Sequence, residues 1–212
     1  MRRLFVLVWT VLCLPWLGAS ALAADAQAAA ARVDRALLAL TAVRAEFVQE
    51  ITVKEGAKPE RAVGTLWLRK PGRFRWEYSS PQQLIVCDGE RLWLYDADLA
   101  QVTVRKIQQS LSQTPAMLLA GQAHVTDGFR VSEGGQLDGL VWSVLTPKNN
   151  DTDFKEIRMG FVGDSLTRLE FVDKLGSRTR LELKNMQRHL ALPDSLFTFT
   201  APAGVDVIGQ AP

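Results

Sequence analysis

Cysteine and histidine are scarce in this chain of 212 residues, and their scarcity excludes several kinds of chemistry. The sequence contains two cysteines, Cys13 and Cys87, and two histidines, His124 and His189. Cys13 lies in a segment that we expect to be removed, so Cys87 has no partner for an intramolecular disulfide. Neither histidine has metal-binding or triad spacing, and we expect both in solvated loops. We therefore expect no structural disulfide, no metal and no cofactor.

Most motifs of catalysis are missing as well. The sequence contains no G-x-S-x-G, no P-loop and no H-E-x-x-H. The run Gly163–Leu166 spells a signature of an esterase and lipase family, which makes Ser165 a candidate nucleophile. A serine hydroxyl needs a base, and no aspartate stands three residues before either histidine. We expect a hairpin turn at these residues and no enzymatic activity, with an esterase that uses Ser165 as an alternative.

Only one long apolar run is present, from Leu4 to Leu17, and it is too short for a typical membrane span. It follows Arg2 and Arg3 and is followed by Ala21-Leu22-Ala23, an A-x-A cleavage site. We expect a cleaved signal peptide over residues 1–23 and one exported domain over residues 24–212. A lipid-modified N-terminus is not expected, because no small residue directly precedes Cys13.

The chain also lacks an excess of charge once the signal peptide is removed. Without Arg2 and Arg3, the 25 basic side chains fall to 23, which equals the number of acidic ones. The basic character of the whole chain therefore belongs to the leader, and nucleic-acid binding has no support.

Strands dominate the rest of the sequence. An Ala-rich helix is expected over 25–42, where Val33, Leu37 and Leu40 recur at helical spacing. Alternating residues and turn signals then predict a mainly β fold of about 11 strands joined by short, antiparallel connections. After a strand near 44–53, the expected strands are 62–69, 73–79, 83–87, 91–95, 101–105, 129–133, 139–145, 154–162, 166–173, 177–185 and 197–200.

A short apolar helix interrupts the strands at Ala116–Leu119, where Pro115 suits the first helical position. It is more apolar than a surface helix needs to be. A long sheet with one apolar face must cover that face. The sequence therefore predicts a curled sheet with a helical plug, a shape that can enclose an apolar cavity.

The segment 64–78, GTLWLRKPGRFRWEY, places aromatic side chains on two strands around a basic turn. This segment, the following LIVCDGERLWLYDADLAQVTV, the TPAMLL helix and the closing FTFTAPAGVDVI resemble the outer-membrane lipoprotein carrier protein family, LolA. The resemblance extends over essentially the whole expected mature chain.

The resemblance implies an incomplete antiparallel β-barrel closed by an α-helical lid over a hydrophobic cavity. It implies a monomeric periplasmic carrier that takes triacylated lipoproteins from an inner-membrane ABC transporter. The carrier would deliver them to an outer-membrane receptor of similar fold. A periplasmic lipid-binding sensor or regulator with the same half-barrel is an alternative.

The carrier hypothesis assigns roles to residues by position. The expected lipid-binding residues of the cavity are Leu66, Leu68, Phe74, Trp76, Met117 and Leu118, with ordinary core packing as the alternative for each. The basic residue that latches the lid in this family is usually Arg and here is Lys70. Because an ammonium lacks the planar fork of a guanidinium, we expect either a weaker latch or one that Arg69 or Arg73 shares.

Overall fold

One sheet makes up most of the computed structural model, which describes residues 18–54, 56–107, 115–121, 124–150 and 152–209, with only the backbone for 18–22 and 117. Its 12 strands follow the order β12-β6-β5-β4-β3-β2-β1-β11-β10-β9-β8-β7. The strands are β1 (Ala42–Thr52), β2 (Glu60–Arg69), β3 (Arg73–Ser80), β4 (Gln82–Asp88), β5 (Arg91–Asp96), β6 (Gln101–Lys106), β7 (Phe129–Leu137), β8 (Leu140–Pro147), β9 (Phe154–Val162), β10 (Ser165–Asp173), β11 (Arg178–Arg188) and β12 (Asp206–Gly209). All neighbours pair antiparallel, as predicted, except β12 and β6, which run parallel.

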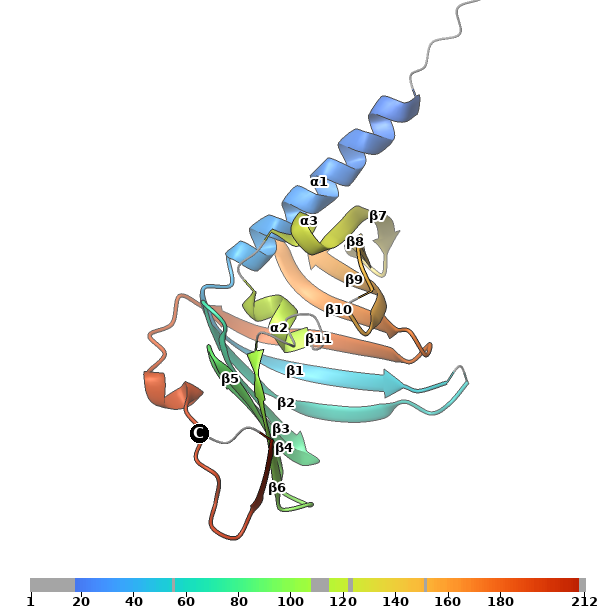
Figure 1. The fold of residues 1–212 in the computed structure, drawn as a ribbon. Coiled ribbons are helices and arrows are strands. Elements are labelled where there is room, and N and C mark those ends of the chain that lie inside the picture. Colours follow the sequence, from blue (N-terminus) through green and yellow to red (C-terminus); the bar gives the residue numbers. More distant parts are fainter. Residues whose placement is uncertain (1–17, 55, 108–114, 122–123, 151, 210–212) are drawn as a thin grey trace, which may run out of the picture.

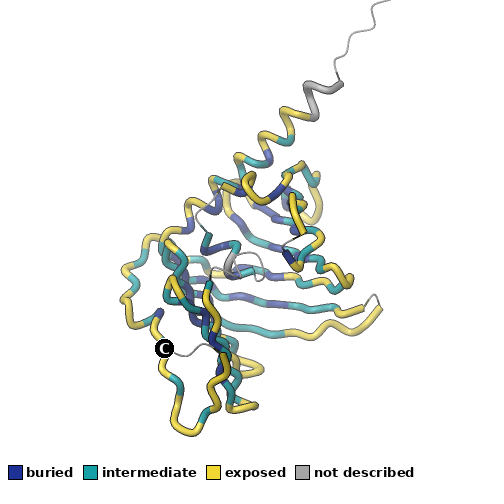
Figure 2. Tube along the Cα trace, in the orientation of Figure 1, coloured by how far each residue is buried: buried dark blue, intermediate teal, exposed yellow. Residues whose placement is uncertain are grey.

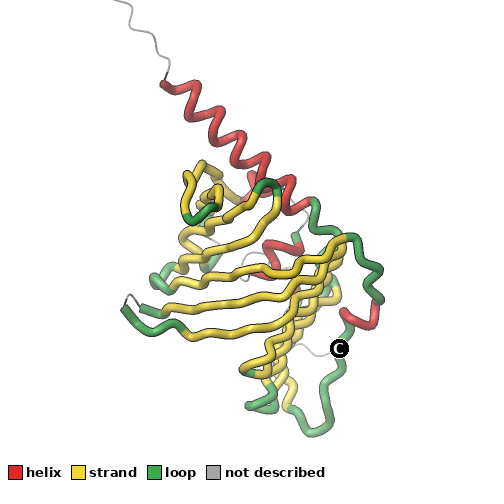
Figure 3. The backbone as a smooth tube through the Cα atoms, turned by 180° about the vertical axis from the view of Figure 1, so that it is seen from behind, coloured by secondary structure: helices red, strands yellow, loops and turns green. Residues whose placement is uncertain are grey.

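The sheet curls strongly but stays open (Figure 1). Its two edge strands, β12 and β7, do not pair with each other. Figure 3 shows the same curled sheet from behind, with the helices gathered toward one end of it. The fold is therefore mainly β, and the expected incomplete barrel takes the form of one open, curled sheet.

The helices α2 (Pro115–Ala120) and α3 (Val125–Gly128) lie on the concave side of this sheet, and α1 (Gly18–Leu38) runs along one end of it with its N-terminal part projecting beyond the strands (Figure 1). The buried side of α1 carries Ala29, Val33, Ala36 and Leu37 at helical spacing. Its Arg32 guanidinium donates two hydrogen bonds to the Glu133 carboxylate on β7, at 2.9 and 3.2 Å. Because packing and this ion pair both hold α1, its C-terminal half is fixed against the sheet.

The concave face holds the core (Figure 2). Cross-strand partners form two apolar rows there, one of Val43, Leu68, Phe74, Cys87 and Leu92, and one of Ala45, Leu66, Trp76, Ile85 and Leu94. Each large apolar side chain buried in this way contributes about 1.5–3 kcal/mol to folding. The alternation of the strands therefore places the apolar face where the sequence predicted it.

The predicted strand over 197–200 is wrong. The 3-10 helix η2 (Asp194–Phe197) lies there instead, followed by an irregular segment that crosses the outer face of the sheet (Figure 1). Phe197 is buried at 1% exposure, and the ring of Phe199 lies 5.8 Å from that of Tyr95 on β5. The alternating Phe and Thr residues thus cover the outer face, and the chain pairs with β6 only at β12, which the sequence did not predict.

Other differences are smaller. α1 begins at Gly18 and ends at Leu38, rather than spanning 25–42, and α3 was not predicted. Residues 1–17 of the expected signal peptide lie outside the described residues. Among the helices that are described, none is long and apolar enough to cross a membrane.

Candidate functional site

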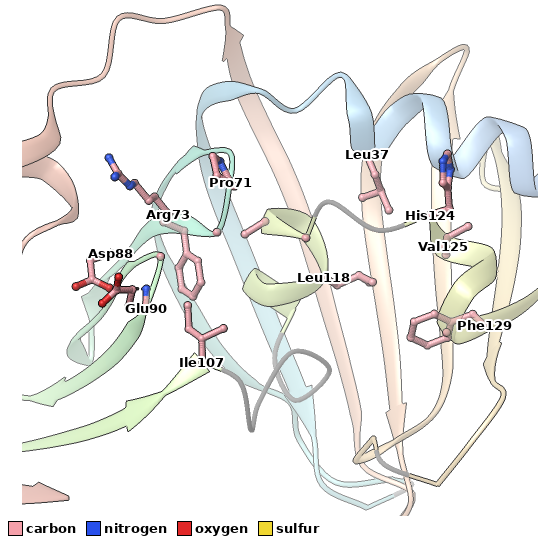
Figure 4. Close-up of a pocket in the computed structure, with 16 residues that line it drawn as sticks. Leu37, Pro71, Arg73, Asp88, Glu90, Ile107, Leu118, His124, Val125 and Phe129 are labelled. Atoms are coloured by element: carbon pink, nitrogen blue, oxygen red, sulfur yellow. Dashed lines mark hydrogen bonds between the residues drawn. The ribbon is translucent and has the colours of Figure 1, made fainter. Parts of the chain in front are cut away.

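A cavity of about 720 Å³ opens where two strand turns meet the three helices (Figure 4). Its volume is typical of a site for a small ligand, about 300–1,000 Å³. Its apolar lining comes from six elements or their flanks and includes Leu37, Phe74, Ile107, Leu118, Val125 and Phe129. Arg73, Asp88 and Glu90 lie at the same end of the cavity as Ile107, and His124, Val125 and Phe129 lie at the other end (Figure 4). The cavity therefore has a largely apolar lining with charged side chains at one end.

The six residues predicted for the cavity fall into three groups. Phe74 and Leu118 line it. Leu66, Leu68 and Trp76 face the same side of the sheet but are at most 2% exposed and belong to the core beside the cavity. The side chain of Met117 lies outside the described part of the structure. Because α2 packs on β2 and β3, it separates the buried group from the open space.

Lys70 connects the turn between β2 and β3 to α1. Its Nζ donates a hydrogen bond to the carbonyl oxygen of Leu37, at 2.7 Å, and its backbone N–H donates to Thr41. Leu37 lies in the last turn of α1, and its carbonyl oxygen also accepts the backbone N–H of Leu40, at 3.1 Å. Burial lowers the pKa of the Lys70 ammonium, so the tie is made by a partly desolvated charge.

Arg69 and Arg73 do not share this contact. Both guanidinium groups bind the Asp194 carboxylate of η2, and Arg69 also donates to the carbonyl of Leu192. The Arg69 guanidinium lies over the Phe197 ring, 4.9 Å from its centroid. These two arginines therefore attach the C-terminal segment to the outer face, and of the three basic residues only Lys70 has a described hydrogen bond to α1.

The turn between these basic residues also touches α2. The backbone N–H of Gly72 donates to the carbonyl of Ala120, at 3.3 Å, and the Gly72 carbonyl accepts a hydrogen bond from the Cys87 thiol, at 2.8 Å. One turn thus meets the C-terminal ends of both α1 and α2.

His124 is an exposed loop residue, as expected, and it also contacts α1. Its Nδ1 lies 3.0 Å from Oδ2 of Asp34 on α1, and the other oxygen of Asp34 accepts the backbone N–H of Val125, at 2.8 Å. His124 and Val125 both line the cavity. Asp34 therefore joins α1 to the start of α3, a role that depends on a contact between distant residues and had no local sequence signal. His189 is exposed, as expected.

A small polar cluster interrupts the aromatic residues of the concave face. The Tyr78 hydroxyl donates to the side-chain carbonyl of Gln49, at 3.2 Å, and the Phe47 ring lies 4.8 Å from Trp76 and 5.1 Å from Tyr78. Burial raises the pKa of Tyr78 to about 12, an effect partly offset by its polar neighbours Gln49 and Trp76. Gln49 and Tyr78 carry no local sequence signal for this contact, because 29 positions separate them.

Ser165 begins β10 and is exposed. In the described residues no hydrogen bond joins its hydroxyl to a histidine, and His124 is paired with Asp34 instead. The arrangement offers the serine no base, so the geometry gives the esterase alternative no support.

Comparison with known proteins gives one consistent result. Residues 39–200 match the profile of the family described as "Outer membrane lipoprotein carrier protein LolA". The chain is 40% identical to the outer-membrane lipoprotein carrier protein of Dechloromonas aromatica over 79% of its length and 81% of that protein. It is also 40% identical to the protein of that name from Methylibium petroleiphilum, over 92% of its length and 97% of that protein. A conserved protein from Thermus thermophilus shares the fold, with a TM-score of 0.53 at 16% identity over 86% of this chain and 98% of that one.

Proposed function

The chain belongs to the LolA family of outer membrane lipoprotein carrier proteins and is itself a lipoprotein carrier, and from this premise we propose that the cavity beneath α1, α2 and α3 receives the acyl chains of its cargo. The family is one of periplasmic carriers rather than enzymes. In the proposed pathway the protein takes triacylated lipoproteins from an inner-membrane ABC transporter and hands them to an outer-membrane receptor of similar fold.

The observation that carries this proposal is the position of the cavity at the edge of a much larger apolar surface. Phe74 and Leu118 line the cavity, while Leu66, Leu68 and Trp76 continue the same face of the sheet under α2. A cavity of about 720 Å³ suits one small ligand, so three long chains need more room. Movement of α2 away from β2 and β3 would supply it.

The energetics favour this arrangement. An acyl chain gains about 0.8 kcal/mol for each CH₂ removed from water, or about 10 kcal/mol for a chain of about 16 carbons. A carrier that offered a permanently open surface would bind such chains too tightly to release them. Because α2 covers part of the apolar face in the empty protein, its displacement offsets part of this gain. We propose that α1 and α2 form the lid and that Lys70 is its latch.

Site-specific photo-crosslinking tests the proposal. A photoreactive phenylalanine analogue at position 74 or 118 is expected to capture lipoproteins in the periplasm. The matched control is position 67, because Trp67 lies on the opposite face of the sheet under the Arg44 guanidinium. Capture at position 67 but at neither cavity position would contradict the assignment. Depletion of the protein should leave outer-membrane lipoproteins at the inner membrane, and their normal localisation would contradict the carrier pathway.

A further inference from the structure

We propose that Gln49, Trp76 and Tyr78 form a subsite for the carbonyl oxygen of an ester or amide group that joins an acyl chain to the lipid anchor of the cargo. This inference rests on the proposed function and adds a polar recognition element to an otherwise apolar site. The three residues are called the carbonyl subsite below.

The carbonyl subsite is built by the register of three strands. Phe47 on β1, Gly64 on β2 and Tyr78 on β3 are direct cross-strand partners. Because Gly64 has no side chain, the rings of Phe47 and Tyr78 meet across it with centroids 5.1 Å apart. Gln49, two residues beyond Phe47 on the same face, then accepts the Tyr78 hydroxyl, and only 9% of Gln49 is exposed.

The indole of Trp76 supplies an unused donor. Its Nε1–H is buried and completes no hydrogen bond of normal geometry among the described residues, although Trp76 is only 2% exposed and its indole lies close enough to the Tyr78 hydroxyl to lower the pKa of Tyr78. Buried tryptophan N–H groups usually have a partner. Trp142, the other fully buried tryptophan, follows this rule, because its Nε1–H donates to the carbonyl of Leu137, at 3.2 Å. The empty protein therefore leaves the Trp76 N–H beside Tyr78 without a well-formed hydrogen bond, so a ligand oxygen could accept it.

The position of this donor fits a bound acyl chain. Residues at every second position of a strand share a face and lie about 7 Å apart. Phe74, Trp76 and Tyr78 thus form a stripe that leads from the cavity along β3 to the partly exposed Tyr78. A chain that enters the cavity beside Phe74 would place its linkage over Trp76 once α2 moves.

The chemistry of the carbonyl subsite selects the ligand group. An ester carbonyl only accepts hydrogen bonds, and the indole N–H and the Gln49 amide NH₂ are donors. None of the three side chains carries a charge at neutral pH, so a neutral ester or amide fits them better than a carboxylate does. The expected ligand is therefore an esterified or amide-linked acyl chain rather than a free fatty acid.

Two synthetic lipopeptides test this inference. One carries two ester-linked chains on its N-terminal cysteine and a free N-terminal amine, and the other has ether linkages in place of the two esters, so only the first offers a carbonyl group that joins an acyl chain to the anchor. Displacement of a fluorescent acyl probe from the mature protein measures the affinity for each. The wild-type protein is expected to bind the ester ligand about tenfold more tightly, a difference of about 1.4 kcal/mol.

A tryptophan isostere isolates the proposed donor. Replacement of Trp76 with benzothienylalanine keeps the shape of the ring and exchanges the N–H for sulfur. We expect the ester preference to fall toward one, while the melting temperature of the empty protein stays unchanged or rises, because a buried unpaired donor has been removed. Tyr78→Phe should also reduce the ester preference, since it removes the hydrogen bond that orients the side-chain amide of Gln49. Tyr95→Phe, at the other tyrosine of the chain, is the matched control and should keep it.

The outcomes separate the two proposals. Tight but equal binding of both ligands by the wild-type protein, or an ester preference that survives the isostere, would overturn the carbonyl subsite alone. If Tyr78→Phe weakened the binding of both ligands equally, Tyr78 would contribute only packing, and the carbonyl subsite would also be overturned. Failure of the wild-type protein to bind either ligand would overturn the acyl-binding cavity, and the subsite with it.

Discussion

The Nζ of Lys70 lies 2.7 Å from the carbonyl oxygen of Leu37, so the turn between β2 and β3 is tied to the last turn of α1. A cation at the C-terminal end of a helix interacts favourably with the helix dipole. Leu37 also lines the cavity, so the tie acts on the wall of the proposed binding site.

Lys70→Leu is expected to lower stability only slightly and to slow ligand release. Loss of a partly exposed charged hydrogen bond should cost about 1 kcal/mol, which is a fall of about 2–4 °C in Tm. Because this hydrogen bond exists in the empty, closed protein, its loss makes the closed state less stable relative to the ligand-bound state. The dissociation rate of a fluorescent acyl probe should therefore fall about threefold to tenfold, as stopped-flow fluorescence would measure.

Lys70→Arg is the matched control, because guanidinium keeps a charged donor at the same place. It should release the probe at close to the wild-type rate. An unfolded Lys70→Leu protein, or one with an unchanged release rate, would contradict the latch role.

The attachment of the C-terminal segment through Asp194 should make the stability of the protein depend on pH. Arg69, and to a lesser extent Arg73, lower the pKa of Asp194. A folded-state pKa below the unfolded value gives a stabilisation that is present above the unfolded pKa and lost as pH falls through the folded pKa. Asp194→Asn should therefore lower Tm at neutral pH, and the difference from wild type should shrink below about pH 4. Thermal melts across this range check it, and a difference independent of pH would contradict the ion pairs.

The strands were predictable because most of them have one buried and one exposed face. In β9, for example, Ile157, Met159 and Phe161 are buried at every second position, and the period is visible in the sequence. β12 has no such period, because all four of its residues are exposed. Its parallel pairing with β6 depends on how the segment after η2 crosses the outer face, which is set by tertiary packing and leaves no local pattern in the sequence.

The candidate site was predictable only where it coincides with a strand or helix pattern. Phe74 and Leu118 line the cavity and came from the aromatic hairpin and the apolar helix. Ile107 and Phe129 were missed, because they join the cavity only through the packing of distant elements. The partner of Lys70 could likewise not be read from the sequence, since 33 positions separate it from Leu37.

Cys87 should be almost inert in the folded protein. Burial raises the pKa of its thiol to about 12, so the thiolate is about a thousandfold rarer than in an unfolded chain at the same pH. Reaction of the mature chain with a disulfide reagent at pH 8 should therefore be about a thousandfold slower in buffer than in denaturant. Comparable rates in both would show that the row containing Phe74 and Cys87 is open to solvent in the empty protein.

Gly64→Ala tests the packing that the carbonyl subsite and the core share. A methyl group at this position would meet the Phe47 ring at 2.6 Å and the Glu77 carbonyl oxygen at 2.0 Å, closer than real contacts allow. Since Glu77 presents backbone of the paired strand β3, the clash cannot be relieved by a rotamer change. We expect a loss of about 3 kcal/mol in the free energy of unfolding, measured by urea denaturation.

Gly128→Ala is the control, because nothing lies within 4 Å of its added methyl group and its stability should stay close to wild type. Equal stability of the two variants would mean that β1 and β3 do not approach across Gly64, and Phe47 and Tyr78 could then not meet as the subsite requires.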